Sequence, residues 1–175
     1  NNNTAIGLAA NGVGDIPSFV VVGSSVVSEI ATIEVTPTYD FNGVTCTGNP
    51  ETFTITVNPG AQVDPVAGQI LCVGESTDEI LFTTSNTDGL TTYEWTNNNT
   101  AIGLAASGIG DIPSFTATND TASALVATIE VTPTYENGGV TCTGNPEIFT
   151  ITVNHGAQVD PVAGQILCVG ESTDE

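Results

Sequence analysis

The sequence predicts an all-β protein made of immunoglobulin-type β-sandwich repeats of about 96 residues in tandem. Residues 1–79 recur as residues 97–175 at a constant offset of 96, and 61 of the 79 aligned positions are identical. A period near 100 is the size of a whole domain rather than of one solenoid turn, so each repeat is expected to hold its own core. Alternating apolar residues and Asn-Gly turns supply the strand signal.

The joints between repeats are expected at the Pro- and Gly-containing stretches 58–65 and 154–161, because these residues interrupt ladders and favour linkers. We therefore expect the C-terminal part of one repeat at 1–63, a complete repeat at 64–158 and the N-terminal start of the next at 159–175. On this interpretation the chain is part of a longer polypeptide.

Strands are predicted by period-two alternation. Apolar residues fall on odd positions in 128–135 and again in 149–153, which is typical of half-buried strands. The segment 136–139 between them suits a tight hairpin, as does Asn42-Gly43 in the other copy. The expected strands of the complete repeat are 66–71, 78–84, 91–97, 112–118, 125–135 and 146–153, with a possible short one near 100–104.

The single tryptophan is predicted to be a core residue. Tyr93 and Trp95 lie two positions apart on one expected strand, so their side chains share a face. We expect Trp95 to fill the space between the two sheets. A tryptophan that stacks on carbohydrate is the functional alternative.

The charge balance excludes several classes of partner. The chain has no Lys or Arg and 20 Asp and Glu residues, giving a formal net charge of −20. Nucleic acid and anionic membrane surfaces are excluded, because both are bound through Lys and Arg. No run of 18 uncharged apolar residues exists, so no membrane insertion is expected. The Thr-, Asn-, Ser- and Gly-rich surface is typical of extracellular proteins, and the negative charge favours solubility.

The four cysteines occupy two repeated places and fit no common zinc spacing, so disulfides are the expected role in an exported protein. A Cys72–Cys142 bond would close a loop of about 70 residues, worth about 4 to 5 kcal/mol. Cys46 and Cys168 would then need partners elsewhere. The alternative pairs Cys46 with Cys72 and Cys142 with Cys168 across the joints. The first pairing is favoured, because an end-to-end array would hold the second pairs apart.

Catalysis is not expected. The one histidine, His155, is replaced by Pro59 in the other copy, so it cannot serve a repeated function as the base for a nucleophile. The acidic residues lie in stretches that are more simply solvated turns than a cleft with two converging carboxylates.

Calcium is the one cofactor with a candidate site. Hard cations bind several carboxylate and carbonyl oxygens at one point. Asp64 and Asp160 lie in the expected joints, and Glu75, Asp78 and Glu79 follow the first strand. A joint could therefore gather acidic side chains from two repeats, although no EF-hand pattern is present.

Several motifs resemble the PKD-like repeats of very large surface adhesins of gliding bacteria. They are Tyr93-Glu94-Trp95, the Cys72-Val73-Gly74 corner, the stretch at 97–108 and the ending at 141–154. The resemblance implies an immunoglobulin-like sandwich, export often by the type IX route, and service as a cell-surface stalk or adhesive fibre. Such repeats commonly carry one cysteine at each of these two places, which supports pairing within a unit. Asp120-Thr121-Ala122 is similar to the O-glycan acceptor of these bacteria, so Thr121 is a candidate glycosylation site.

Together these features predict an extracellular, non-catalytic repeat array whose partners are copies of itself and, as a candidate, a surface polysaccharide. Many weak contacts in such an array add through multivalency. In a variant of this hypothesis, neighbouring chains complete each other's domains by strand addition and form a filament. The alternative from another class is a carbohydrate-binding accessory module of a secreted enzyme.

Overall fold

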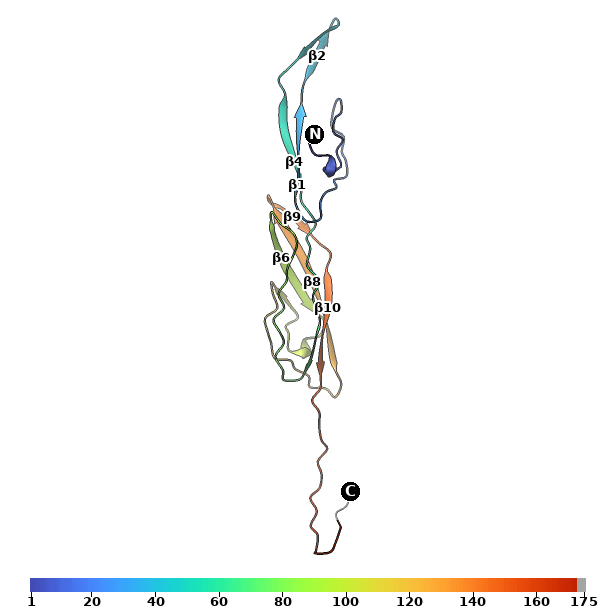
Figure 1. Ribbon diagram of the computed structural model, residues 1–175, viewed down its shortest axis with the longest axis vertical. Helices are drawn as coiled ribbons and strands as arrows, with labels where there is room; N and C mark the ends of the chain where they lie inside the picture. Colours follow the sequence, from blue (N-terminus) through green and yellow to red (C-terminus); the bar gives the residue numbers. More distant parts are fainter. Residues whose placement is uncertain (173–175) are drawn as a thin grey trace.

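The computed structural model describes residues 1–172, and this part of the chain is all-β (Figure 1). Its strands are β1 (Glu29–Val35), β2 (Thr38–Phe41), β3 (Val44–Thr47), β4 (Glu51–Val57), β5 (Gln69–Cys72), β6 (Leu90–Asn97), β7 (Ser107–Ile109), β8 (Leu125–Asn137), β9 (Val140–Thr143) and β10 (Glu147–Asn154). Two short 3-10 turns, η1 (Thr4–Ile6) and η2 (Thr100–Ile102), complete the elements of residues 1–172.

The chain forms two units placed end to end along one long axis, followed by an extended segment (Figure 1). The first unit comprises residues 1–58 and has a small core around Ile6, Ala31 and Ile33. The second unit comprises residues 61–154 and holds the large core. Residues 155–172, called the tail below, run away from the second unit.

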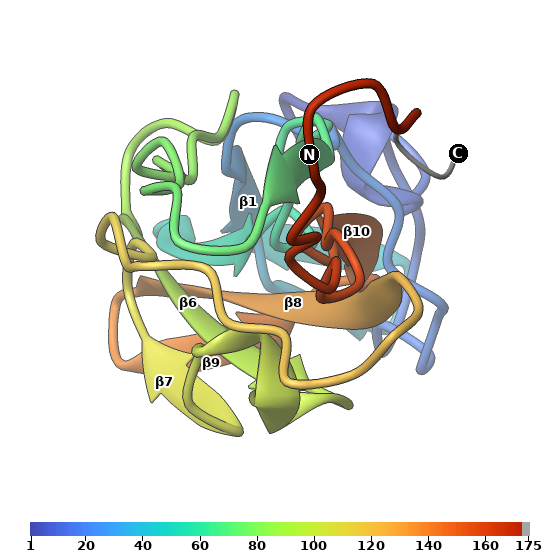
Figure 2. The ribbon, with the colours of Figure 1, turned by 90° about the horizontal axis from the view of Figure 1, so that it is seen from below.

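The second unit is built on one six-stranded sheet with the order β5-β10-β8-β6-β7, in which β9 also pairs with β8. All neighbours are antiparallel except β5 and β10, which run parallel. Strand β8 is long enough to pair with β10 along Leu125–Val131 and with β9 along Thr134–Asn137, while β6 occupies its other edge. Figure 2 looks along the long axis and shows β6 and β8 crossing the second unit as one layer.

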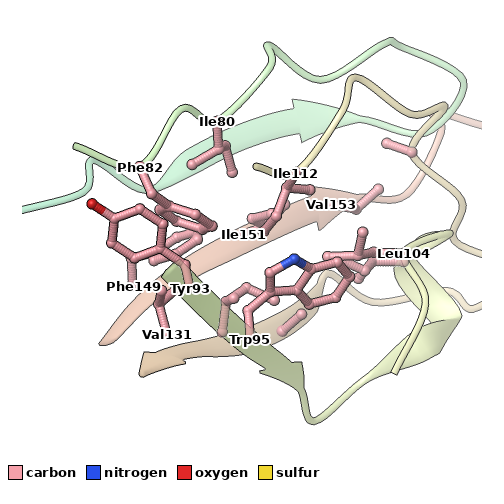
Figure 3. Packing of buried hydrophobic residues seen from close by; sticks show 14 residues of the cluster. Ile80, Phe82, Tyr93, Trp95, Leu104, Ile112, Val131, Phe149, Ile151 and Val153 are labelled. Atoms are coloured by element: carbon pink, nitrogen blue, oxygen red, sulfur yellow. The ribbon is translucent and has the colours of Figure 1, made fainter. Parts of the chain in front are cut away.

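The core lies on one face of this sheet, beneath an irregular layer (Figure 3). The alternation expected for 128–135 and 149–153 is confirmed, because every second residue is buried. The sheet contributes Tyr93, Trp95, Ala127, Ile129, Val131, Phe149, Ile151 and Val153. The irregular layer contributes Ile80, Phe82, Ile102, Leu104, Ile112 and Ala117.

Three expected strands are absent from the described residues. The segments 78–84 and 112–118 form only the isolated bridge Ile80↔Ile112 and its neighbour Ser76↔Thr116. The segment near 100–104 is the turn η2, because the Asn99 side chain accepts from the backbone N–H of Ala101 at 3.2 Å and Gly103 takes φ +97°. Strands β7 and β9 were not predicted.

The expected hairpin is confirmed between β8 and β9. Gly138 and Gly139 take φ of +61° and +76°, and Asn42 and Gly43 take +51° and +78° in the equivalent turn. Two consecutive positive φ values make the tight turn that matches the twist of the flanking strands. The two copies also share their strand register, since Glu29↔Val57 and Leu125↔Val153 differ by the repeat offset.

Trp95 is a core residue, as predicted. It is 5% exposed, and its ring covers Gly108 so closely that a Cβ there would overlap the indole. The alternative of a carbohydrate-stacking tryptophan is therefore wrong for Trp95 in this fold. Neighbouring Tyr93 packs on Phe82 with ring centroids 5.5 Å apart. Burial, together with the carboxylates of Asp64 and Asp111, raises the pKa of Tyr93, which keeps its hydroxyl protonated.

We predict that Gly108→Ala lowers the free energy of unfolding by about 1 to 3 kcal/mol, because the added methyl group forces Trp95 out of its packed position. Chemical denaturation followed by Trp95 fluorescence measures this. The matched control is Gly12→Ala, at the equivalent position of the first unit, where no atom lies within 4 Å of the added Cβ. Equal effects of the two substitutions would contradict the prediction.

Candidate functional site

The joint between the two units is the candidate functional site, and uncharged side chains hold it together. Asn58 follows β4, Ser28 precedes β1, and Asn137 ends β8. The Asn58 side chain donates to the backbone carbonyl of Asn137 at 3.0 Å, and the Asn137 side chain donates to Ser28 Oγ at 2.9 Å. Ser28 in turn donates to Asn58 Oδ1 at 3.0 Å. The three side chains form a closed network across the joint.

A second group of contacts comes from the segment before β6. The Asn86 side chain donates to the backbone carbonyls of Ser25 and Gly60, at 3.1 and 3.3 Å. Its Oδ1 accepts from the backbone N–H of Gln62 at 2.8 Å. Asn86 therefore fixes the first unit, the linker and the second unit to one another.

Tyr135 connects the core of the second unit to the joint. Its ring is fully buried, and its hydroxyl donates to the carbonyl of Thr87 at 2.8 Å and lies 3.3 Å from Ser28 Oγ. The backbone N–H of Thr87 donates to the carbonyl of Val26 in the first unit at 3.1 Å. A Cβ at Gly89 would overlap the Tyr135 ring, so glycine is needed there.

The linker itself is packed rather than exposed. Pro59 is fully buried and Ala61 is 5% exposed. The carbonyl of Ala61 lies against Gly144, where a Cβ would overlap it. A short, buried linker with satisfied polar groups restricts the angle between the units.

The sequence patterns did not identify these joint residues, although the divergence between the two copies points to part of the joint. The two copies differ most in 20–30 against 116–126, where 11 of the 18 mismatches fall. Ser25, Val26 and Ser28 of the first copy belong to this segment and contact the second unit. The variable segment therefore lies at the joint.

The four cysteines are all free, and the geometry opposes the Cys72–Cys142 pairing predicted from the sequence. Strands β5 and β8 both pair with β10, which places Cys72 near the level of Leu125. Cys142 opposes Tyr135. Ten residues of β8 separate these levels, about 33 Å, whereas disulfide Cα atoms lie within about 7 Å. The two cysteines of the second unit therefore lie at its opposite ends in this structure.

The cysteines of the alternative pairs also lie far apart in this structure. Cys46 opposes Tyr39 in the β2–β3 hairpin, at the end of the first unit remote from the joint (Figure 1). Cys72 lies at the opposite end of the next unit. Cys142 lies near the joint, while Cys168 lies on the tail beyond the far end of the second unit. Each pair is therefore separated by at least one full unit.

The predicted calcium ligands do not form a cluster. Asp64 Oδ2 accepts from Thr83 Oγ1 at 2.7 Å, and Glu75 Oε2 accepts from the backbone N–H of Cys72 at 2.8 Å. Asp64, Asp78 and Glu79 border one shallow groove. Asp160 lies on the exposed tail. Within residues 1–172, no three Asp, Glu, His or Cys side chains lie close enough to hold an ion.

Thr121, the candidate glycosylation residue, is exposed in a turn at the far end of the second unit. Its hydroxyl lies 2.8 Å from both Asn119 Oδ1 and the carbonyl of Ser123. At the repeat offset it corresponds to Ser25, which contacts the second unit. A glycan on Thr121 would therefore project from the end that corresponds to a joint.

No protein-family model matches the chain, and no curated protein matches it. In the part of the chain that the structure describes, no helix has the length and apolar character needed to cross a membrane.

We predict that Asn58→Ala loosens the joint, because it removes the two hydrogen bonds that connect Asn58 to Asn137 across the joint, at 3.0 and 3.3 Å, and the bond from Ser28 that orients the Asn58 side chain. The joint should lose about 1 to 3 kcal/mol, and small-angle X-ray scattering should show a broader range of inter-unit orientations. The matched control is Asn154→Ala, the equivalent exposed residue at the other end of the second unit. Identical scattering curves for the two variants would contradict the assignment of Asn58 to the joint.

Proposed function

We propose that this chain is a non-catalytic structural array, exposed on the cell surface, whose repeats give length to a stalk or adhesive fibre. The observation that carries the proposal is the hydrogen-bonded joint, which fixes two successive units end to end. A stalk depends on such a joint, because its length is maintained only if successive units are held along one axis.

The fold of each repeat is proposed to be an immunoglobulin-like sandwich of the PKD-like type. The core between the six-stranded sheet and the irregular layer supports a two-layered domain. The antiparallel bridges Ser76↔Thr116 and Ile80↔Ile112 are consistent with a short, second sheet in that layer. The shared register of the two copies supports the proposal that the unit is repeated in tandem.

The surface chemistry supports an extracellular location, with export by the type IX route as part of the proposal. A chain without Lys or Arg gives trypsin-like proteases no cleavage site. Its net charge of −20 keeps a concentrated array soluble and extended by self-repulsion. The proposed partners are further copies of the repeat and a surface polysaccharide, bound through many weak contacts.

An antibody against this chain tests the proposal on intact cells of the source organism. We expect proteinase K to remove the antibody signal and trypsin to leave it, because the chain is accessible outside the cell but lacks Lys and Arg. Electron microscopy of the native protein should show long, thin threads. A signal that withstands proteinase K on intact cells, and is lost only after lysis, would contradict the extracellular location.

A further inference from the structure

The joint contains an asparagine that is followed directly by glycine, Asn137-Gly138. Asn137 is the last residue of β8 and is half-buried, and its side chain donates to Ser28 of the first unit. Gly138 begins the turn to β9 and takes φ +61°, a backbone conformation that favours glycine. Contact between the units thus places a side-chain amide at 137, and the turn places a glycine after it.

An Asn-Gly dipeptide can react with itself, because the backbone nitrogen of the glycine can close a succinimide ring on the side-chain carbonyl carbon of the asparagine. Glycine has no Cβ to hinder this attack, and asparagine is among the thermolabile residues of proteins. In the part of the chain that the structure describes, the N–H of Gly138 donates no hydrogen bond. Nothing lies within 4 Å of the place that a Cβ would take at Gly138. The attacking nitrogen is therefore unhindered.

The closed joint directs the Asn137 amide away from this nitrogen. Asn137 Nδ2 donates to Ser28 Oγ at 2.9 Å and to Asn58 Oδ1 at 3.3 Å, and both acceptors belong to the first unit. The Asn58 side chain donates in return to the carbonyl of Asn137 at 3.0 Å. Ring closure requires the Asn137 side chain to turn back toward Gly138, so both Nδ2 bonds must break first. The reaction is therefore confined to molecules in which the joint has opened locally.

We propose that Asn137 is a self-modifying site, which loses its amide when the joint opens and thereby keeps the joint open. The substrate is the side-chain amide of the chain itself, and the co-reactant is water. Ser28, Asn58 and Asn137 all lie within the two joined units, so the site is complete in these units. The proposal goes beyond a structural role for the joint, because it gives the joint a chemical record of having opened.

The reaction proceeds in two steps that together consume one water and release one ammonia. The backbone nitrogen of Gly138 bonds to Cγ of Asn137 and gives up its proton, while the bond from Cγ to Nδ2 breaks and Nδ2 leaves as ammonia with that proton. Water then opens the succinimide at either of its carbonyl groups. The product at 137 is an aspartate or its β-linked isomer, and neither step needs an oxidant or a reductant.

The product cannot make the hydrogen bonds that close the joint. The amide nitrogen of Asn137 donates two bonds, whereas a carboxylate only accepts. The carboxylate would face Asn58 Oδ1, which is itself an acceptor, and Ser28 has a single proton for the two of them. The nearby Tyr135 hydroxyl already donates to the carbonyl of Thr87 at 2.8 Å. Because the chain has no Lys or Arg to pair with the new charge, burying it in the closed joint is costly.

The chain contains two further Asn-Gly dipeptides that serve as internal standards, Asn11-Gly12 and Asn42-Gly43. Both asparagines are exposed. Neither side chain has a hydrogen-bond partner among residues 1–172. Their deamidation is therefore independent of the joint, and each molecule reports the protected and the unprotected rates together.

The first test measures the three rates in the full chain, incubated at mildly alkaline pH, digested with pepsin and analysed by mass spectrometry. We expect Asn137 to deamidate about tenfold or more slowly than the two standards, because two hydrogen bonds hold its amide, and the three rates to converge in urea. Asn58→Ala should bring the rate at Asn137 close to that of the standards. The matched control Asn154→Ala, at the equivalent place in the second unit, should leave the rate at Asn137 unchanged.

The second test asks whether the product opens the joint. Asn137→Asp and the matched control Asn42→Asp each add one negative charge, and Trp95 fluorescence during denaturation checks that the second unit is folded in both. Small-angle X-ray scattering should show a broader range of inter-unit orientations for Asn137→Asp alone. Deamidated wild-type chain, separated by ion exchange, should scatter as Asn137→Asp does.

Equal rates at the three asparagines in the native chain would overturn the protection of Asn137 by the joint. Identical scattering from Asn137→Asp and Asn42→Asp would overturn the claim that the product keeps the joint open. Neither result bears on the protease test with intact cells, so the proposed function stands or fails separately.

Discussion

Strand β8 is the element on which the rest of the structure depends. Its 13 residues pair with β10, β6 and β9, so it links every part of the main sheet. Its alternate side chains form the centre of the core and end in Tyr135, whose hydroxyl reaches the joint. Because one continuous strand supplies the core and the joint, a change in its register would move both. The position of the joint is thus set by the same backbone pairing that folds the second unit.

The sequence predicted the sheet well and the opposite layer poorly, for a physical reason. Period-two alternation reports a strand with one buried face, and β8 and β10 are such strands. In the irregular layer, side-chain oxygens accept hydrogen bonds that the backbone of a neighbouring strand would accept in a sheet. Asp111 accepts from the backbone N–H of Phe82 at 2.8 Å, and Thr77 Oγ1 accepts from the backbone N–H of Phe115 at 3.0 Å. Apolar residues in this layer are buried without regular strand pairing, so their pattern predicts strands that do not form.

The site could be predicted only in part. Which residues meet at the joint, and how far apart the cysteines lie, depend on the position of each residue along the long axis of the molecule. Cys72–Cys142 was favoured because an end-to-end arrangement would hold the alternative pairs apart, yet β8 holds the two ends of the second unit apart as well. The joint residues are Asn, Ser and Tyr, which are common in surface turns and carry no motif. Their one signal was the segment in which the copies diverge. Divergence at a joint allows each pair of neighbouring units to have its own set of contacts.

The absence of Lys and Arg links these features. A joint closed by salt bridges is impossible in this chain, and Asn58, Ser28 and Asn137 close it with neutral hydrogen bonds instead. Neutral bonds are not weakened by salt as exposed ion pairs are. Self-repulsion of an acidic chain meanwhile favours an extended arrangement and opposes contact between chains. Salt therefore leaves the hydrogen bonds of the axial joint unchanged while it screens the repulsion between acidic chains.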